Sequence, residues 1–287
     1  MTPTNPYENE GPDTHTTEAE LSGEKEFEEG LRYEKGEGME KDMRRAFQWL
    51  DKAACNGHIA AMNRVGCCYH HGVGTTKNMK KAFSWFTKAA NNGDADAMNN
   101  VGCCFDDGEG VTQDKAKAFE WFLKSAEKGN ADAMFSVGRC YNNGEGVTQD
   151  KTKAFEWLLK SAENGNPQAM LIVALKHFDG EGVAQDKTKA FEWLLKSADN
   201  GNADAMFRVG LYYFNGPGVP QDKTKAFEWW LKSAENGNTY GINRVGCCYR
   251  DGVGVSKDLE KAREWFTKAL NNGCTWAKEN LIQCVAK

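Results

Sequence analysis

The sequence predicts an all-α fold of stacked helix-turn-helix repeats, because three residue columns recur along the chain at a constant step of 36. A tryptophan occupies the first column, a Gly-x-Gly pair the second, and an aspartate or asparagine the third. Such columns indicate a repeat array, in which each unit buries its apolar face against its neighbours. The columns are Trp49, Trp85, Trp121, Trp157, Trp193, Trp229 and Trp265; Gly36/Gly38, Gly72/Gly74, Gly108/Gly110, Gly144/Gly146, Gly180/Gly182, Gly216/Gly218 and Gly252/Gly254; and Asp42, Asn78, Asp114, Asp150, Asp186, Asp222 and Asp258.

The N-terminal segment differs from the repeats in composition. Residues 1–40 hold 12 acidic and 3 basic side chains, a net charge of −9, whereas the rest of the chain carries +4. Residues 1–22 contain few aromatic or branched aliphatic side chains, so we expect a disordered acidic tail there and the repeats over residues 23–287. A charge of +4 spread along the array argues against nucleic-acid binding, which needs a concentrated basic face.

The second helix of each repeat is predicted by segments such as KAFEWFLKSAEKG, 117–129. Its apolar residues follow a helical period. They are Ala118, Phe119, Phe122 and Ala126. Asp114 is expected to cap the N-terminus by accepting hydrogen bonds from the first turn, and Gly129 to end the helix.

The first helix is predicted by segments such as ADAMFSVGRCYNN, 131–143. Its constant positions lie on one helical face. They are Ala133, Met134, Val137, Gly138 and Tyr141. Gly138 costs a helix about 1 kcal/mol relative to alanine, so we expect it to allow close approach of the partner helix. The Gly-x-Gly pair joins the two helices.

Seven helix pairs and one capping helix follow from this register. The first pair is degenerate in its opening helix, and the last helix covers the exposed end of the array, as repeat proteins require. The pairs are expected at 22–57, 58–93, 94–129, 130–165, 166–201, 202–237 and 238–273, and the cap at 274–286.

The repeat resembles the Sel-one-like repeat, a relative of the tetratricopeptide repeat. The family pattern A-x-A-M-x-x-V-G-x-x-Y-x-x-G-x-G-V-x-x-D-x-x-K-A-x-x-W-x-x-K-A-A-x-x-G is nearly complete in residues 131–165. The resemblance implies a right-handed α-solenoid with the first helix of each pair on the concave side. It also implies the non-enzymatic role of a scaffold or adaptor in protein–protein interaction.

One segment, VGCCYHHGVG at 65–74, has the residue types of a metal site. Cys67, Cys68, His70 and His71 fall within five positions, which leaves a metal-binding repeat protein as one alternative. In the other repeats, however, cysteine at these two positions alternates mainly with Leu and Tyr. We therefore expect the cysteines to act as small, mostly apolar packing residues.

A second alternative is a secreted β-lactam-binding or β-lactamase-like protein, because some secreted members of the family have that activity. Ser-x-x-Lys occurs at Ser22–Lys25 and Ser125–Lys128, but no Ser-Asp-Asn or Lys-Thr-Gly accompanies it. The cysteines that bridge the two helices in that subgroup also lack their mates here. No catalytic residues, cofactor or metal are expected.

Variation between repeats marks a candidate partner-binding site. Three positions of the first helix, aligned with residues 63, 67 and 70, form one stripe that is polar or small in the outer repeats and apolar in the middle ones. An exposed apolar patch is typical of an interaction site, although the stripe is also suited to packing between first helices. The predicted residues are Phe135, Leu171, Leu175, Phe178, Phe207, Leu211 and Phe214.

The expected partner is a protein or peptide. The sequence has no apolar run long enough for a transmembrane helix and no signal peptide at its N-terminus. We therefore expect a cytoplasmic monomer, and the sequence leaves non-classical secretion open.

Overall fold

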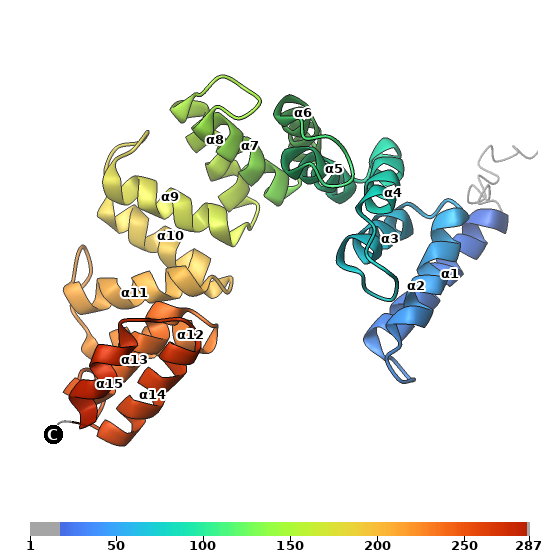
Figure 1. Ribbon diagram of the computed structural model, residues 1–287. Helices are drawn as coiled ribbons and strands as arrows, with labels where there is room; N and C mark the ends of the chain where they lie inside the picture. The colour runs from blue at the N-terminus through green and yellow to red at the C-terminus, as the bar shows by residue number, and fades with distance from the viewer. Residues whose placement is uncertain (1–17, 286–287) are drawn as a thin grey trace, which may run out of the picture. The chain divides into compact units, whose positions relative to one another are not determined.

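The computed structural model describes the backbone of residues 18–285 and the side chains of residues 23–284. Within these residues the chain forms fifteen α-helices and no strand, which confirms the predicted all-α fold (Figure 1). The helices are α1 (Glu18–Lys35), α2 (Met43–Cys55), α3 (Ile59–His71), α4 (Met79–Asn91), α5 (Ala95–Asp107), α6 (Lys115–Glu127), α7 (Ala131–Asn143), α8 (Lys151–Glu163), α9 (Pro167–Asp179), α10 (Lys187–Asp199), α11 (Ala203–Asn215), α12 (Lys223–Glu235), α13 (Thr239–Asp251), α14 (Leu259–Asn271) and α15 (Ala277–Val285).

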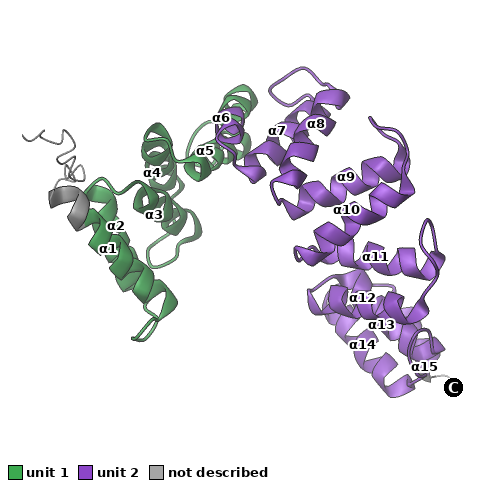
Figure 2. Cartoon of the chain, turned by 180° about the vertical axis from the view of Figure 1, so that it is seen from behind, with its two compact units in different colours: residues 1–121 green, residues 122–287 purple. Residues whose placement is uncertain are grey.

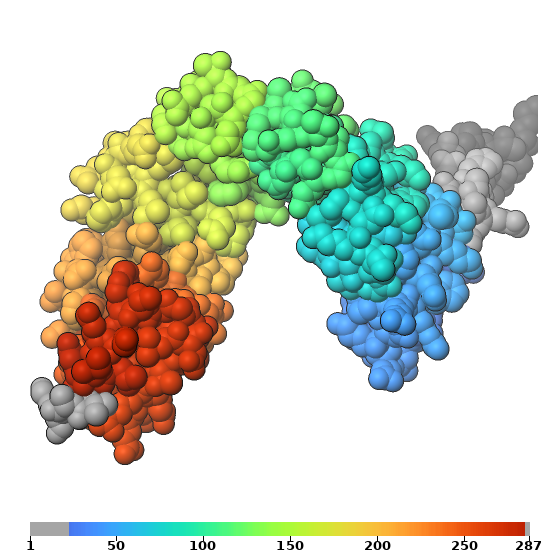
Figure 3. All heavy atoms as spheres, viewed as in Figure 1, coloured from blue at the N-terminus to red at the C-terminus, as the bar shows by residue number. Residues whose placement is uncertain are grey.

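The chain divides into two compact units within α6 (Figure 2). Unit 1 ends at Trp121 and unit 2 begins at Phe122. In each unit, consecutive helices pack against each other, which is the arrangement of an α-solenoid. In unit 2 the space-filling view shows segments that follow one another in chain order, from green through yellow and orange to red (Figure 3).

The two ends of the array differ from the prediction in detail. The expected acidic tail, 1–22, lies for the most part outside the described residues, but α1 begins at Glu18, before the expected boundary at residue 23. Good helix formers such as Glu, Ala and Leu extend the helix there. At the other end, α15 begins at Ala277, so the expected cap over 274–286 is helical only in its later part.

The predicted capping residues confirm the register. In α10, for example, Asp186 is extended and its side chain accepts from the N–H groups of Thr188 and Lys189. The first helix of a pair ends at a left-handed glycine, such as Gly180 after α9, whose φ is 75°. At Gly110 a side chain is excluded for two reasons: its φ is positive, and a Cβ there would collide with the carbonyl oxygen of Met79 in α4.

Polar contacts as well as apolar packing hold the helices of a pair together and join one pair to the next. The fully buried Ser233 of α12 donates to the carbonyl oxygen of Ala203 in α11 at 2.8 Å. Asn238, the N-cap of α13, donates from its side chain to Asp204 at 2.5 Å while its own oxygen accepts from the N–H of Gly241. Such bonds between consecutive helices fix the stacking distance as well as the pairing.

Tryptophans of the column pack against the preceding repeat. Trp85 of α4 lies against the core cluster of α2 and α3, and Trp193 of α10 against the core cluster of α8 and α9. The tryptophan side chains are half-buried, and the lysine three residues later lies over the ring of Trp49, Trp85, Trp157, Trp193, Trp229 and Trp265. In the pair Trp193 and Lys196 the ammonium nitrogen lies 4.3 Å from the ring centroid.

Candidate partner-binding surface

The seven predicted residues lie on α7, α9 and α11 in unit 2, and none of them is exposed. Leu171 is buried, with 7% of its surface accessible, and the other six are half-buried. The stripe is therefore a set of partly covered positions between first helices. Its members have different surroundings, which divide it into three parts.

The first part borders a hollow between α7 and α9. Phe135 and Leu175 line it together with Leu158 from α8, and its volume is about 360 Å³. The polar residues at this hollow include Arg139, Lys176, Asp179 and Glu181, with Lys176 Nζ 3.6 Å from a Glu181 oxygen. This hollow is charged at its rim and apolar at its base.

The second part surrounds a smaller and more apolar pocket between α9 and α11. Leu175, Phe178 and Leu211 line it, and its volume is about 170 Å³. The remaining lining residues are Ala174, Leu194, Arg208, Tyr212, Asn215 and Pro217. Three of the predicted residues thus converge on one pocket.

The third part packs against the next repeat. The ring of Phe214 lies 5.5 Å from that of Trp230, centroid to centroid, and Phe207 lies 6.0 Å from Tyr240. The guanidinium of Arg244 lies 5.1 Å from the Phe214 ring. Phe207 and Phe214 therefore support the fold of unit 2 directly, and so does the buried Leu171 in the cluster of α9 to α11.

Tyr212 is a site residue that sequence reasoning missed. Its ring lies 5.3 Å from Phe191 and 6.1 Å from Phe178, and only 7% of the residue is accessible. The hydroxyl has no hydrogen-bond partner among the described residues. Burial raises the pKa of the Tyr212 phenol to about 12, with Arg208 acting in the opposite direction and Asp179 in the same one. The phenol is therefore a neutral donor at physiological pH.

A second missed feature is a row of aromatic rings at the C-terminal end. Tyr240 lies 5.8 Å from Trp276, and their accessible fractions are 54% and 62%. The sequence signal was available, because the aligned position is Asp, Gln or Ala in the preceding repeats. The predicted stripe, aligned with residues 63, 67 and 70, does not include this position.

The cysteine–histidine segment on α3 does not assemble a metal site. Nowhere in the described part of the chain do three or more His, Cys, Asp or Glu side chains come together in a group that could hold a metal. His70 instead pairs with Glu109 at 2.8 Å, and its ring lies 4.5 Å from that of His71. Cys67 and Cys68 are half-buried, and burial raises the pKa of both thiols, that of Cys68 to about 11.

Of the two Ser-x-x-Lys matches, only the one at Ser125 has a described serine side chain. Ser125 is fully buried within α6, and the side chain of Ser22 lies outside the described residues. A nucleophile needs access to its substrate and a base within hydrogen-bond reach. The β-lactam alternative therefore gains no support from the site.

None of the described helices combines the length and the hydropathy that a membrane span requires.

Comparison with known proteins agrees with the repeat register. The profile of the Sel1 repeat matches seven consecutive segments, 30–58, 59–94, 95–130, 131–166, 167–202, 203–238 and 239–274. No curated protein sequence matches the chain.

Among solved structures, a Sel1 repeat protein from Oxalobacter formigenes is 32% identical, with a TM-score of 0.75 over 92% of this chain and 77% of that one. A protective antigen of uropathogenic Escherichia coli that displays an SLR fold is 35% identical, with a TM-score of 0.69 over 90% of this chain. The chain spans 56% of the length of that antigen. An immunity protein from Pseudomonas aeruginosa shares the fold at 19% identity, with a TM-score of 0.51 over 76% of this chain and 83% of that one.

Proposed function

The chain belongs to the Sel1 repeat family, and from that premise we propose that it is a non-enzymatic scaffold that binds a protein or peptide partner. The binding surface of this proposal is the face of the middle first helices, which the family resemblance puts on the concave side of the array. The observation that carries the proposal is the pair of hollows on α7, α9 and α11, lined by four of the predicted residues.

Apolar positions between first helices are suited to this role for a physical reason. A solenoid leaves one side of each helix without a partner helix, so residues there can be half-covered by neighbours and still contact a ligand. Leu175 and Leu211 have this intermediate exposure and line the pocket. Helices and extended peptides bind to such grooves by inserting a few anchor side chains.

The test needs a substitution that changes the surface and keeps the fold. The repeats provide one, because Arg139 occupies the position aligned with Leu175 and Leu211 and is half-buried in α7. We therefore choose the double substitution L175R/L211R. Serine at Phe207 and Phe214 would be a poorer choice, because both rings pack against the next repeat.

The experiment is affinity capture from a native lysate followed by a measured dissociation constant for each captured protein. We expect a partner that binds the wild type and is bound at least tenfold more weakly by L175R/L211R. The matched control is C103R, which makes the same change at the aligned, exposed position of α5 and is expected to bind as the wild type does. A partner that binds all three proteins equally would contradict the proposed surface.

We extend the proposal to the reducing environment of the cytoplasm. The support is the use of cysteine as a core residue, since Cys104, Cys248 and Cys284 are buried and burial raises the thiol pKa of the first two to about 12. Alkylation of intact cells before lysis tests this point. When the protein is then denatured in excess of the same reagent, all ten cysteines are expected to carry the alkyl group. Pairs of cysteines that stay unmodified because they form disulfides would argue for an oxidising compartment.

A further inference from the structure

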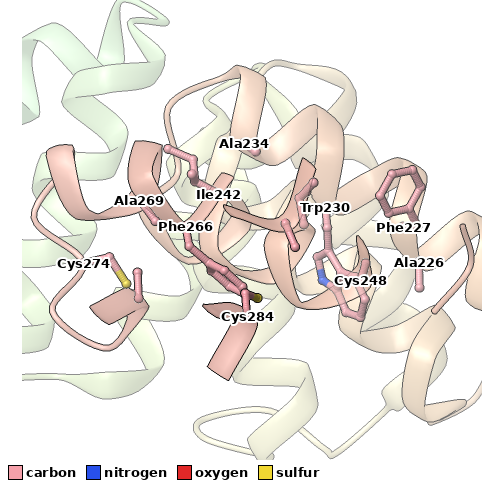
Figure 4. Packing of buried hydrophobic residues seen from close by; sticks show 13 residues of the cluster. Ala226, Phe227, Trp230, Ala234, Ile242, Cys248, Phe266, Ala269, Cys274 and Cys284 are labelled. Atoms are coloured by element: carbon pink, nitrogen blue, oxygen red, sulfur yellow. The ribbon is translucent and has the colours of Figure 1, made fainter. Parts of the chain in front are cut away.

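The pocket between α9 and α11 has a filled counterpart one repeat later. Leu194 of α10 lines the pocket, and Trp230 occupies the aligned position in α12. Trp230 is completely buried and belongs to the core cluster that also contains Cys248 (Figure 4). The two sites are one repeat apart at aligned positions and differ in the side chain that fills them. We call the site at Leu194 the open step and the site at Trp230 the filled step.

The filled step shows how a large ring is held there. The Trp230 nitrogen donates to the carbonyl oxygen of Phe207 at 3.1 Å, and its ring lies 5.5 Å from Phe214. The guanidinium of Arg244 covers the ring at 4.6 Å. An aromatic neighbour and a cation above the ring both favour an aromatic side chain.

The open step keeps these two partners and lacks the ring. Phe178 and Arg208 line the pocket, and they are aligned with Phe214 and Arg244. Ala174 replaces the glycine that accommodates Trp230 in the next step, and Leu194 replaces the indole itself. The space that remains is about 170 Å³, below the 300–1,000 Å³ typical of small-molecule sites and suited to a single side chain.

Tyr212 gives the pocket one polar requirement. The residue is more than nine-tenths buried, and within the described residues its hydroxyl lacks a hydrogen-bond partner. A buried donor without an acceptor is unfavourable, so a ligand that brings an oxygen gains affinity by pairing with it. Peptide segments carry such oxygens on every residue.

We propose that this pocket binds an aromatic side chain of the partner, which lies between Phe178 and Arg208 as Trp230 lies between Phe214 and Arg244. The peptide segment that carries the ring supplies the acceptor for Tyr212. This inference rests on the proposed scaffold function and specifies the chemistry of its anchor residue. An aromatic anchor in a desolvated pocket is the usual form of a binding hot spot.

The direct test uses small probes and the full chain, and needs no knowledge of the partner. N-acetyl-L-phenylalaninamide carries the ring and peptide carbonyl groups, and N-acetyl-L-alaninamide carries the carbonyl groups alone. We expect the first probe to shift the amide resonances of Ala174, Leu175 and Phe178 saturably in NMR titrations. The second probe is expected to leave these resonances unchanged.

A variant of the chain closes the pocket with residues that the next step already uses. The substitutions A174G, L194W and Y212C copy Gly210, Trp230 and Cys248, so the change in side-chain volume follows a combination that packs well in this protein. The triple variant is expected to bind the phenylalanine probe at least tenfold more weakly. Unchanged resonances in α13 to α15 serve as the control for folding.

Two single variants keep the cavity and remove one contact each. R208Q and Y212F are each expected to weaken the phenylalanine probe about threefold, because one removes the cation and the other the donor. These variants decide the matter if the triple variant fails to fold.

The proposal is overturned if the pocket amides show no saturable shift with the phenylalanine probe. It is also overturned if the alanine probe binds equally well, or if R208Q, Y212F and the folded triple variant all bind as the wild type does. If the aromatic-anchor proposal fails in these tests but L175R/L211R still loses the captured partner, the proposed scaffold function is retained. Loss of the scaffold function would instead appear as equal capture by that variant and the wild type.

Discussion

The close contact between Gly210 of α11 and Trp230 of α12 yields a quantitative prediction. A Cβ at Gly210 would lie well inside 3.0 Å of the indole, a separation that real Cβ atoms essentially never show. Trp230 cannot yield easily, because it is fully buried and its nitrogen is bonded to the Phe207 carbonyl. The substitution Gly210→Ala therefore forces the ring or the helix to move.

The expected cost follows from three effects. Overpacking a core costs about 1–3 kcal/mol, and a buried indole N–H that loses its acceptor costs about 1–3 kcal/mol. Alanine gains about 1 kcal/mol over glycine within a helix. Taken at the middle of each range, these effects give an expected loss of about 3 kcal/mol in the free energy of unfolding for Gly210→Ala.

The chain itself suggests a compensating change. Ala174 and Leu194 are the aligned pair one repeat earlier, so Trp230→Leu is expected to remove the collision. Trp230→Leu alone costs about 2–3 kcal/mol through the cavity it leaves. The double variant is expected to be about as stable as Trp230→Leu alone, which gives an interaction free energy of about 3 kcal/mol between the two sites.

Urea unfolding followed by circular dichroism measures the three free energies, and amide hydrogen exchange in α11 and α12 measures the local effect, since a repeat array can unfold in parts. Gly23→Ala is the matched control, because a Cβ at Gly23 in α1 would make only ordinary contacts, at 3.5 Å or more. That control is expected to be neutral or slightly stabilising. The reasoning is refuted if Gly210→Ala is as stable as the wild type, or if the costs of the two substitutions simply add.

Three further predictions concern a buried bond, the thiols and an N-cap. Ser233→Ala is expected to lower the free energy of unfolding by about 1 kcal/mol, measured in urea, because it leaves a backbone carbonyl of the preceding helix without its side-chain donor. Cys248 is buried with its pKa raised to about 12, so it is expected to react with a disulfide reagent at pH 8 much more slowly than the exposed Cys55, and equal rates would contradict its burial. The backbone and side-chain hydrogen bonds from Lys117 lower the pKa of Asp114, so its contribution is present above the unfolded value of about 3.9 and is lost as the pH falls through the lower folded value. Unfolding measured between pH 5 and pH 2 is expected to depend less on pH in Asp114→Asn, and an unchanged profile would contradict this assignment.

The repeats themselves were predictable because their signals lie along the chain. Caps such as Asp186 and the left-handed Gly180 depend on the residues within one turn, so a column in the sequence is sufficient to find them. The start of α1 at Glu18 was not found, since an end with no repeat partner has no column to define it.

The candidate site was predicted only in part, because burial depends on residues from different columns. The predicted stripe includes Leu175, Phe178 and Leu211, which line one pocket. It could not separate Leu171, which is core, or Phe214, whose neighbour Trp230 comes from the second helix. The free space between two helices depends on the volumes of the side chains that both helices place there. The residues of a single column therefore cannot predict it.

Two columns that face each other account for both the buried cysteines and the pocket. One is the column of Trp230 in the second helix, and the other is the column of Cys248 in the following first helix. The aromatic residues of the second helices in the core clusters share their clusters with a cysteine of the following repeat, as Phe86 does with Cys104 and Trp230 with Cys248. Small residues opposite large ones keep the total volume of a core constant, which is the condition that packing requires. The small size of cysteine therefore explains its use at Cys104 and Cys248.

The same rule accounts for the open step. Leu194 is smaller than the aromatic residues, and Tyr212 shares its cluster in place of a cysteine, so the volumes again compensate. The compensation is incomplete, because about 170 Å³ remains empty and the Tyr212 hydroxyl has no partner in the described structure. Incomplete packing is unfavourable in an isolated core and useful at a surface that binds a ligand, since the missing contacts are then made by the partner. The unfilled volume of this step lies where the apolar stripe reaches the surface, which is the position that the aromatic-anchor proposal requires.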